Sequence, residues 1–459
     1  MNEMFLVFCD PPRTMDFPQE SYYKLNRTLL SLVGQWPYGD RRNNIIRRCF
    51  VYLAFLSWLI CQITKIIELH FHWNKILETY THLVIFLTMF SLFTLNIRGI
   101  DQFQELWEEM KRDWCSDRME EETRIKERYA EESKLITKAI TIVVFVELIS
   151  LAIFATFFTT ILDVIIPLNQ SRKKVTGLRY EFFLDEEKYF YWIIIYMSLS
   201  AFVVATSGVA NLTAFCMHLQ HACGMLEALG YRLQNAIPND GNHLGGSVDP
   251  ANDVCYRSLS ICINRHREAT QFAATLESYY SNTLCIVMLM EVLIISPALV
   301  QLSEKVEVLA IGQMCYSIVL LYVVSYFGQR MIDMSSSLKD KIYCSKWYEC
   351  SLRSQKLLPL IILRCERPSS LTAYNFCTIS LDCFRIANWA ILLHGPQANS
   401  IITNIIFLSS KFMPPVWAHM LHLRDNTRIK WMVIVKQQDD EDYYLRNDKQ
   451  HISIGRSVV

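Results

Sequence analysis

The chain lacks the short signatures that mark the common enzyme classes. Its 459 residues contain no phosphate-binding glycine loop, no G-x-S-x-G nucleophile turn and no H-E-x-x-H zinc helix. Its formal net charge is zero, so no basic excess points to nucleic acid. We therefore expect a protein that is not an enzyme, uses no cofactor and binds no nucleic acid.

A cysteine framework is also missing. Fifteen cysteines are present but none forms a C-x-x-C pair, so the sequence predicts neither a zinc site nor a redox motif. Most of them lie within apolar runs or in segments predicted to be cytoplasmic, and we expect cysteine there to behave as a small buried hydrophobe. The opening MNEMFLVFCDPP has no basic segment before its short apolar run, so we expect the first membrane helix to direct insertion.

Long apolar runs dominate what is present. Hydrophobic residues make up 52% of the chain, and the 20% that are charged lie almost wholly between the runs. A membrane-spanning helix needs about 20 predominantly apolar residues. The sequence therefore predicts an all-α, seven-transmembrane-helix protein. The predicted spans are Arg48–Glu68, Ile76–Ile97, Lys138–Leu162, Tyr189–Met217, Thr283–Leu302, Val308–Gly328 and Leu371–Leu393. A weaker eighth candidate, Ser400–Met420, is interrupted by Lys411, Pro414 and Pro415.

Basic residues set the orientation of these helices. The stretch RRNNIIRR leads into the first span, and the segments that alternation places inside carry roughly four times as many Lys and Arg residues as the outer loops. Arg172-Lys173-Lys174, in an outer loop, is the main exception. We predict an intracellular N-terminus, which is the reverse of a G-protein-coupled receptor.

The inner segments have their own helical patterns. Residues 101–137 are rich in charge and place apolar residues at helical spacing: Phe103, Leu106, Trp107, Met110 and Trp114. Residues 218–236 and 252–275 continue the fourth and fifth helices as amphipathic extensions, and the Gly/Pro/Asn/Asp-rich stretch between them predicts a mobile loop.

These patterns divide the chain into three regions. Residues 1–47 are predicted to be a cytoplasmic segment, and residues 48–394 a seven-helix receptor domain. Its cytoplasmic helical anchor is predicted at about 218–275 and 329–370. Residues 395–459 are predicted to be an atypical tail.

Aromatic residues cluster in the outer halves of several helices. Tyr189, Tyr191 and Trp192 fit an interfacial aromatic belt. Residues one or two turns deeper, with a few hydroxyl or amide groups, fit a pocket for a small volatile organic ligand. The predicted ligand-binding residues are Tyr80, Phe86, Phe154, Phe157, Phe158, Tyr196, Gln313 and Tyr316.

Four further polar residues admit two interpretations. Glu147 and Glu291 lie inside predicted spans, where an ionisable group is costly and marks either a functional site or a hydrogen-bonded contact between helices. His218 and His221 have H-x-x-H spacing at the inner end of the fourth span. They fit either metal ligands or ordinary interfacial histidines.

Asn169-Gln170-Ser171 in an outer loop is an N-glycosylation sequon.

The later part of the chain carries specific short motifs. They are YFGQR at 326–330, SKWYE at 345–349, LRSQKLLPLIILRCERPSSLTAYNF at 352–376 and SLDCF at 380–384. This region resembles the insect odorant receptors, which have a Phe-Gly-Gln ending the sixth helix and a Trp-Tyr before a basic amphipathic segment. An Arg and a Pro, here Arg364 and Pro368, then lead into the seventh helix. The early GQWPY at 34–38 is similar to hymenopteran members.

The resemblance implies an odorant-specific subunit in the plasma membrane of a sensory dendrite. Such a subunit assembles with a shared coreceptor into a tetrameric cation channel. The ligand pocket of the family lies in the outer membrane half, and the inner ends of the later helices form an anchor between subunits. The residues that the resemblance assigns to the pore and anchor are Trp347, Tyr348, Ser380 and Asp382.

After Phe384 the sequence departs from the family pattern. It continues RIANWAILLHGPQ, and Arg385 is spaced to pair with Asp382 on one helix face. The residues that follow are either a genuine alternative ending or a reading frame that has run past a splice site.

Two rival functions remain open. A G-protein-coupled receptor predicts an external N-terminus and D-R-Y and N-P-x-x-Y motifs, which this sequence lacks. A secondary transporter predicts substrate uptake without a coreceptor.

Overall fold

The computed structural model describes residues 20–68, 73–116, 119–165, 185–236, 253–304 and 308–386. These residues belong to one compact unit, which spans residues 1–405. The predicted loop at 237–251, the sequon at Asn169 and the tail lie outside the described residues. So does the eighth helix candidate, and the domain boundary near residue 395 stays a prediction.

Helices build almost all of the described chain, which confirms the all-α prediction. In chain order they are α1 (Glu20–Leu32), α2 (Arg41–Glu68), α3 (Trp73–Arg98), α4 (Ile100–Cys115), α5 (Glu120–Ile165), α6 (Glu186–Gln234), α7 (Val254–Glu304) and α8 (Val308–Tyr343). Shorter elements follow: η2 (Trp347–Glu349), α9 (Leu352–Gln355), α10 (Leu358–Cys365), β1 (Thr372–Ala373) and β2 (Cys377–Thr378).

Six of the described helices are long and apolar enough to cross a membrane, and they contain the first six predicted spans. The seventh predicted span, Leu371–Leu393, is described only as far as residue 386. Helix α6 has 49 residues, which is about 70 Å of helix. Because a hydrocarbon core is about 30 Å thick, much of α6 must project beyond the membrane.

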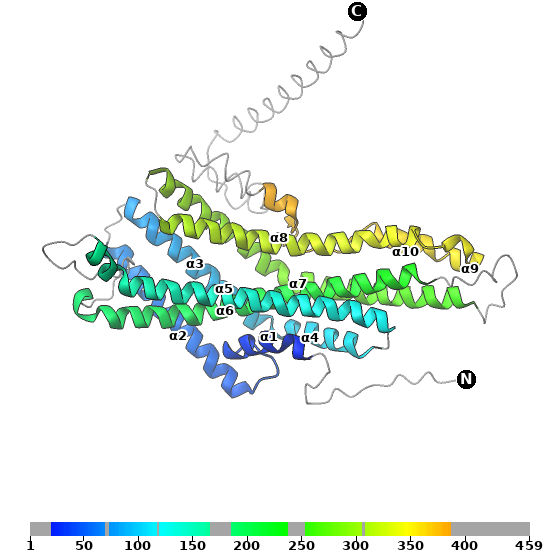
Figure 1. The fold of residues 1–459 in the computed structure, drawn as a ribbon, viewed down its shortest axis with the longest axis horizontal. Coiled ribbons are helices and arrows are strands. Elements are labelled where there is room, and N and C mark those ends of the chain that lie inside the picture. Colours follow the sequence, from blue (N-terminus) through cyan, green and yellow to red (C-terminus); the bar gives the residue numbers. More distant parts are fainter. Residues whose placement is uncertain are drawn as a thin grey trace, which may run out of the picture. The chain divides into compact units, whose positions relative to one another are not determined.

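The projecting parts are the predicted inner extensions. Helix α6 continues to Gln234 and α7 begins at Val254, so helical extensions are confirmed over most of 218–236 and 252–275. The amphipathic character predicted for 218–236 is wrong, because nearly every residue there is buried between neighbouring helices. Helix α4 buries Phe103, Leu106, Trp107 and Met110, as their spacing predicted. Figure 1 shows α5, α6, α7 and α8 running side by side, with α9 and α10 near one end of α8.

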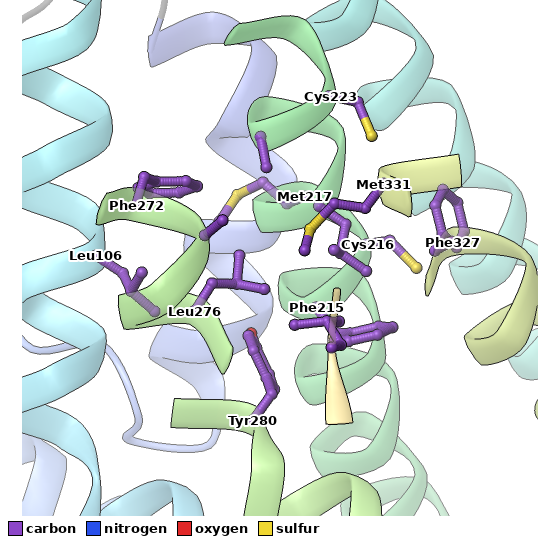
Figure 2. Packing of buried hydrophobic residues seen from close by; sticks show 14 of the residues in the cluster. Leu106, Phe215, Cys216, Met217, Cys223, Phe272, Leu276, Tyr280, Phe327 and Met331 are labelled. Carbon is purple, nitrogen blue, oxygen red and sulfur yellow. The ribbon is translucent and has the colours of Figure 1, made fainter. Parts of the chain in front are cut away.

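The tightest packing surrounds the inner part of α6. Nearly every residue from 213 to 226 is buried, and the side chains pack between α4, α7 and α8 (Figure 2). The residues labelled there are Phe215, Cys216, Met217 and Cys223 of α6, Phe272, Leu276 and Tyr280 of α7, Phe327 and Met331 of α8, and Leu106 of α4. Truncating a fully buried side chain such as Met217 to alanine costs about 2–5 kcal/mol in cores of this kind.

The prediction that the seventh helix begins at Leu371 is wrong. Strands β1 and β2 pair antiparallel as a hairpin, and helix resumes only at residues 381–386. Tyr374 and Asn375 at the tip both have positive φ, 50° and 61°, and the Phe376 N–H bonds the Ala373 carbonyl at 2.9 Å. Because Ala373 pairs with Cys377, the three residues 374–376 connect the two strands of this hairpin. Composition misled the prediction because a short apolar run fits a buried hairpin as well as a helix.

Candidate functional site

The last described helix, residues 381–386, begins against the inner part of α8. Gly328 faces the backbone of Ile379 so closely that an added Cβ would collide with its carbonyl oxygen. The next residue, Gln329, accepts a hydrogen bond from the Leu381 N–H at 3.3 Å. We call Phe327-Gly328-Gln329, together with the hairpin that it contacts, the helix-seven seat.

Helix α7 holds the other side of the helix-seven seat. The Thr372 hydroxyl donates to the Glu277 carboxylate at 2.7 Å, and the Tyr374 N–H donates to the Ser281 hydroxyl at 2.9 Å. Sequence reasoning missed Glu277 and Ser281, because nothing local signals a partner more than 90 residues away.

Ser380 and Asp382 lie at the start of the last described helix. The Ser380 hydroxyl accepts from the Cys383 N–H at 3.2 Å, which is the role of a helix N-cap. Asp382 pairs with Arg385 at 3.2 Å, so the predicted i,i+3 pair is confirmed. Phe384 packs edge-on to Tyr322 of α8, with ring centroids 5.7 Å apart.

Trp347 and Tyr348 differ in their surroundings. Trp347 is half-buried and packs against the main core, whereas Tyr348 is exposed. Both stay predicted anchor residues. Just beyond them, Cys350 lies 3.3 Å from Cys255 at the start of α7, measured between the sulfur atoms.

Asp253 joins the start of α7 to the α9 turn. Burial by itself would raise the pKa of the Asp253 carboxyl. Hydrogen bonds from the Ser351 hydroxyl, the Tyr256 N–H and the Ser354 hydroxyl outweigh that effect and hold the pKa below its ordinary value. The ionised carboxylate therefore fixes α9 to α7.

Buried ion pairs hold the inner ends of the helices together. Glu122 of α5 pairs with Arg232 of α6. Lys126 of α5 pairs with Asp113 of α4, and His221 of α6 lies 3.2 Å from the same carboxylate. The two histidines with H-x-x-H spacing therefore have different partners. His221 belongs to this ionic cluster, and His218 contacts the Tyr280 hydroxyl at 2.9 Å.

Among the predicted ligand residues, Phe86 lies in a packed aromatic cluster. Its ring centroid is 5.6 Å from that of Phe55 in α2 and 6.0 Å from that of Phe90 in α3. Tyr80, also of α3, is half-buried. Tyr196 of α6 is half-buried as well and packs on Ile193 and Met197 beside α2.

The remaining ligand candidates lie on α5 and α8. Phe154 and Phe157 are exposed on α5, and Tyr316 is 41% exposed on α8 beside half-buried Gln313. The side chain of Phe158 lies outside the described part of α5. The structure therefore distributes the seven candidates with described side chains over two regions, one formed by α2, α3 and α6 and the other by α5 and α8. The pocket stays a prediction.

The two intramembrane acids also differ. Glu291 is buried on α7, and its Oε2 atom has no hydrogen-bond partner within the described residues. Glu147 is exposed on α5. Ser317 of α8 is fully buried and interacts with the Glu291 carboxyl, so Glu291 fits a polar contact between α7 and α8.

Known proteins share both sequence and fold with this chain. The 7tm odorant receptor family model matches residues 73–391. The odorant receptor coreceptor of Anopheles gambiae is 22% identical over 169 residues, which cover 35% of each chain. Odorant receptor 49a of Drosophila melanogaster is 43% identical over 65 residues, 14% of this chain and 16% of that receptor. The matched segments thus span about a third of the coreceptor's length and less of the receptor's.

The fold is similar to that of a solved insect olfactory receptor, OR5 from Machilis hrabei in complex with eugenol. The TM-score is 0.64 at 14% sequence identity, over 83% of this chain and 98% of that chain. A likeness at this identity shows a common fold.

Proposed function

Because the chain belongs to the 7tm odorant receptor family, we propose that it is an odorant-recognising subunit of a ligand-gated cation channel. It binds a small volatile organic molecule in the outer half of its helix bundle. It assembles with the shared coreceptor, as a heterotetramer, in the plasma membrane of a sensory neuron. Odorant opens the channel by binding the open state more tightly than the closed state.

The helix-seven seat is the observation that carries this proposal. Gln329 and Ile379 fix the start of the last helix to α8, while Glu277 and Ser281 fix its hairpin to α7. Helix α8 also carries Gln313 and Tyr316 in its outer half. A ligand that moves α8 would therefore move the start of the seventh helix, because α8 contacts it directly through Gly328 and Gln329.

The anchor surface supports assembly with a partner. The α9–α10 region exposes Leu352, Leu360 and Leu363, with Leu352 at 77%. This region belongs to the end predicted to lie in the cytoplasm, where no lipid covers it. Exposed apolar groups in water mark sites of protein association, and we assign this surface to contacts between subunits.

The test is an odorant-panel recording from cells that express the chain with the coreceptor. Surface labelling is the control. Odorant-evoked current that is absent when either protein is omitted supports the proposal. Surface protein without current for any odorant contradicts it, unless replacing the residues after Phe384 by a family-type ending restores the current. In that case the receptor assignment stands and the present ending is the defect.

A further inference from the structure

A small cavity lies where the N-terminal segment meets α3, α4, α6 and α7. Its volume is about 10 Å³, which is close to the smallest space that holds one water molecule. Its lining residues are Leu30, Gln35, Asn96, Phe103, Asn211, Ala214, Tyr279 and Tyr280. None of these eight side chains is charged, and five of them are polar.

The GQWPY stretch places Gln35 in this lining. Gly34 has a φ of 74°, and its N–H bonds the Ser31 carbonyl while the Gln35 N–H bonds the Leu30 carbonyl at 2.8 Å. This pattern ends α1 as a Schellman motif, which needs glycine at that position. Trp36 then packs edge-on to Trp107 of α4, with centroids 5.0 Å apart. The turn is therefore rigid.

The side-chain amide of Gln35 is buried without hydrogen-bond partners. Its side chain is 4% exposed, yet neither its Oε1 nor its Nε2 atom has a hydrogen-bond partner within the part of the chain that the structure describes. A buried amide without partners is destabilising. Natural proteins usually satisfy such a group with a buried water when polar neighbours are available.

The other lining groups can complete the coordination of such a molecule. The Tyr279 hydroxyl donates to Asn96 Oδ1 at 3.1 Å, so its oxygen can still accept. Tyr280 contacts His218 at 2.9 Å. The absence of any carboxylate among the lining residues disfavours a metal cation, whose charge would be left uncompensated.

We propose that the cavity binds one water molecule, which bridges the Gln35 amide to Asn211 and the Asn96–Tyr279 pair. The site joins the N-terminal segment to α3, α6 and α7 through hydrogen bonds that span the inner part of the bundle. The GQWPY stretch is then a docking element for the N-terminal segment. This inference is independent of which ligand the receptor recognises.

The first test replaces Gln35 by methionine in the full chain in detergent. Methionine has nearly the same shape but no hydrogen-bond donor and only a weakly accepting sulfur. If a water molecule bridges the Gln35 amide to its neighbours, Gln35→Met removes one hydrogen-bond partner of that water. We then expect the melting temperature to fall by about 2–4 °C. An unchanged or higher melting temperature overturns the proposal.

The reference variant is Gln62→Met, a buried glutamine outside this cavity whose Nε2 donates to the His82 carbonyl at 3.4 Å, so it reports the fall for losing a hydrogen-bonded buried amide. A fall for Gln35→Met comparable to that of the reference supports the bridging water.

The second test does not depend on how the variant folds. A high-resolution density map of the unmodified chain should show one peak within hydrogen-bond distance of Gln35, and an empty cavity refutes the site. Replacing sodium by choline distinguishes water from a bound cation. A melting temperature that does not change supports water, and one that falls assigns the site to sodium instead.

Discussion

The two ends of helix α5 differ in what surrounds them: buried ion pairs at the inner end and exposed apolar residues further out. Its inner end buries Glu122 against Arg232 and Lys126 against Asp113, and Thr137 donates to Asn26 of α1 at 3.2 Å. Its most apolar stretch buries none of its residues. One continuous helix therefore passes from a polar, protein-packed environment to an apolar stretch that contacts α6 on one side, where Phe145 stacks on Phe202, and is exposed on the other.

This contrast shows which contacts determine how the helices pair with one another. Buried charged pairs require one particular partner, because an unpaired buried charge is very costly. An apolar face in lipid requires only apolar character, so many arrangements satisfy it. The buried ion pairs of the inner half thus specify which helices meet there, whereas the exposed apolar face of α5 specifies no particular partner.

Breaking the Glu122–Arg232 pair should have the largest effect. Glu122→Met leaves a buried guanidinium unpaired, and we expect a loss of about 3–5 kcal/mol in stability, with most surface protein lost. Thermal melting and surface labelling measure this. The matched control, Arg124→Ala, breaks exposed pairs on the same helix with Glu120 and Glu121 and should cost about 0–1 kcal/mol. Equal effects would contradict the contrast between the two environments.

The double variant Glu122→Met with Arg232→Met sharpens this test. Because it removes both charges, we expect it to regain most of the lost stability.

The helix-seven seat is the next most sensitive position. Gly328→Ala pushes a methyl group against the Ile379 carbonyl, and overpacking of this kind costs about 1–3 kcal/mol. We expect reduced odorant current at matched surface level. Gly312→Ala on the same helix meets nothing within 4 Å and should leave current unchanged. A silent Gly328→Ala would show that the seat does not couple α8 to the last helix.

Side chains in the outer half should change ligand potency without changing folding. Replacing Tyr316 by alanine should shift the odorant dose-response by about tenfold, equivalent to about 1.4 kcal/mol of binding. Phe158→Ala is expected to act likewise. Surface labelling should stay unchanged, and Ile149→Ala on the exposed face of α5 is the control. Unaltered dose-response curves for both variants would remove them from the pocket.

The smallest effect is expected on the exposed face of α5. Val146→Ala removes two methyl groups from an exposed position, so stability should change by less than about 0.5 kcal/mol. A melting-temperature loss as large as that of a core truncation such as Leu276→Ala would show that a partner subunit covers this face.

Sequence reasoning succeeded where the pattern is local. The apolar runs predicted six helices that are present, and the spacing of Phe103, Leu106 and Met110 predicted the buried face of α4. Asp382 and Arg385 pair because they are three residues apart on one helix. Each of these follows from the helical period alone.

It failed where distant segments decide the outcome. The run from Leu371 was assigned to helix, yet Glu277 and Ser281 of α7 hold it as a hairpin. Nothing near Glu122 indicates that its partner is Arg232, 110 residues later. Seven of the eight ligand candidates are aromatic, but the structure distributes those with described side chains over two regions.

The sequence by itself determined the class of protein: a helical membrane chain with long inner extensions and the odorant receptor motifs. Apolar runs and basic flanks suffice for that, because insertion into a bilayer depends on the composition of each segment. Only the tertiary structure decided which buried charges pair, that the FGQ motif holds the start of the last helix, and that Gln35 faces a small cavity. Those features depend on contacts between segments far apart in the chain, which no local pattern encodes.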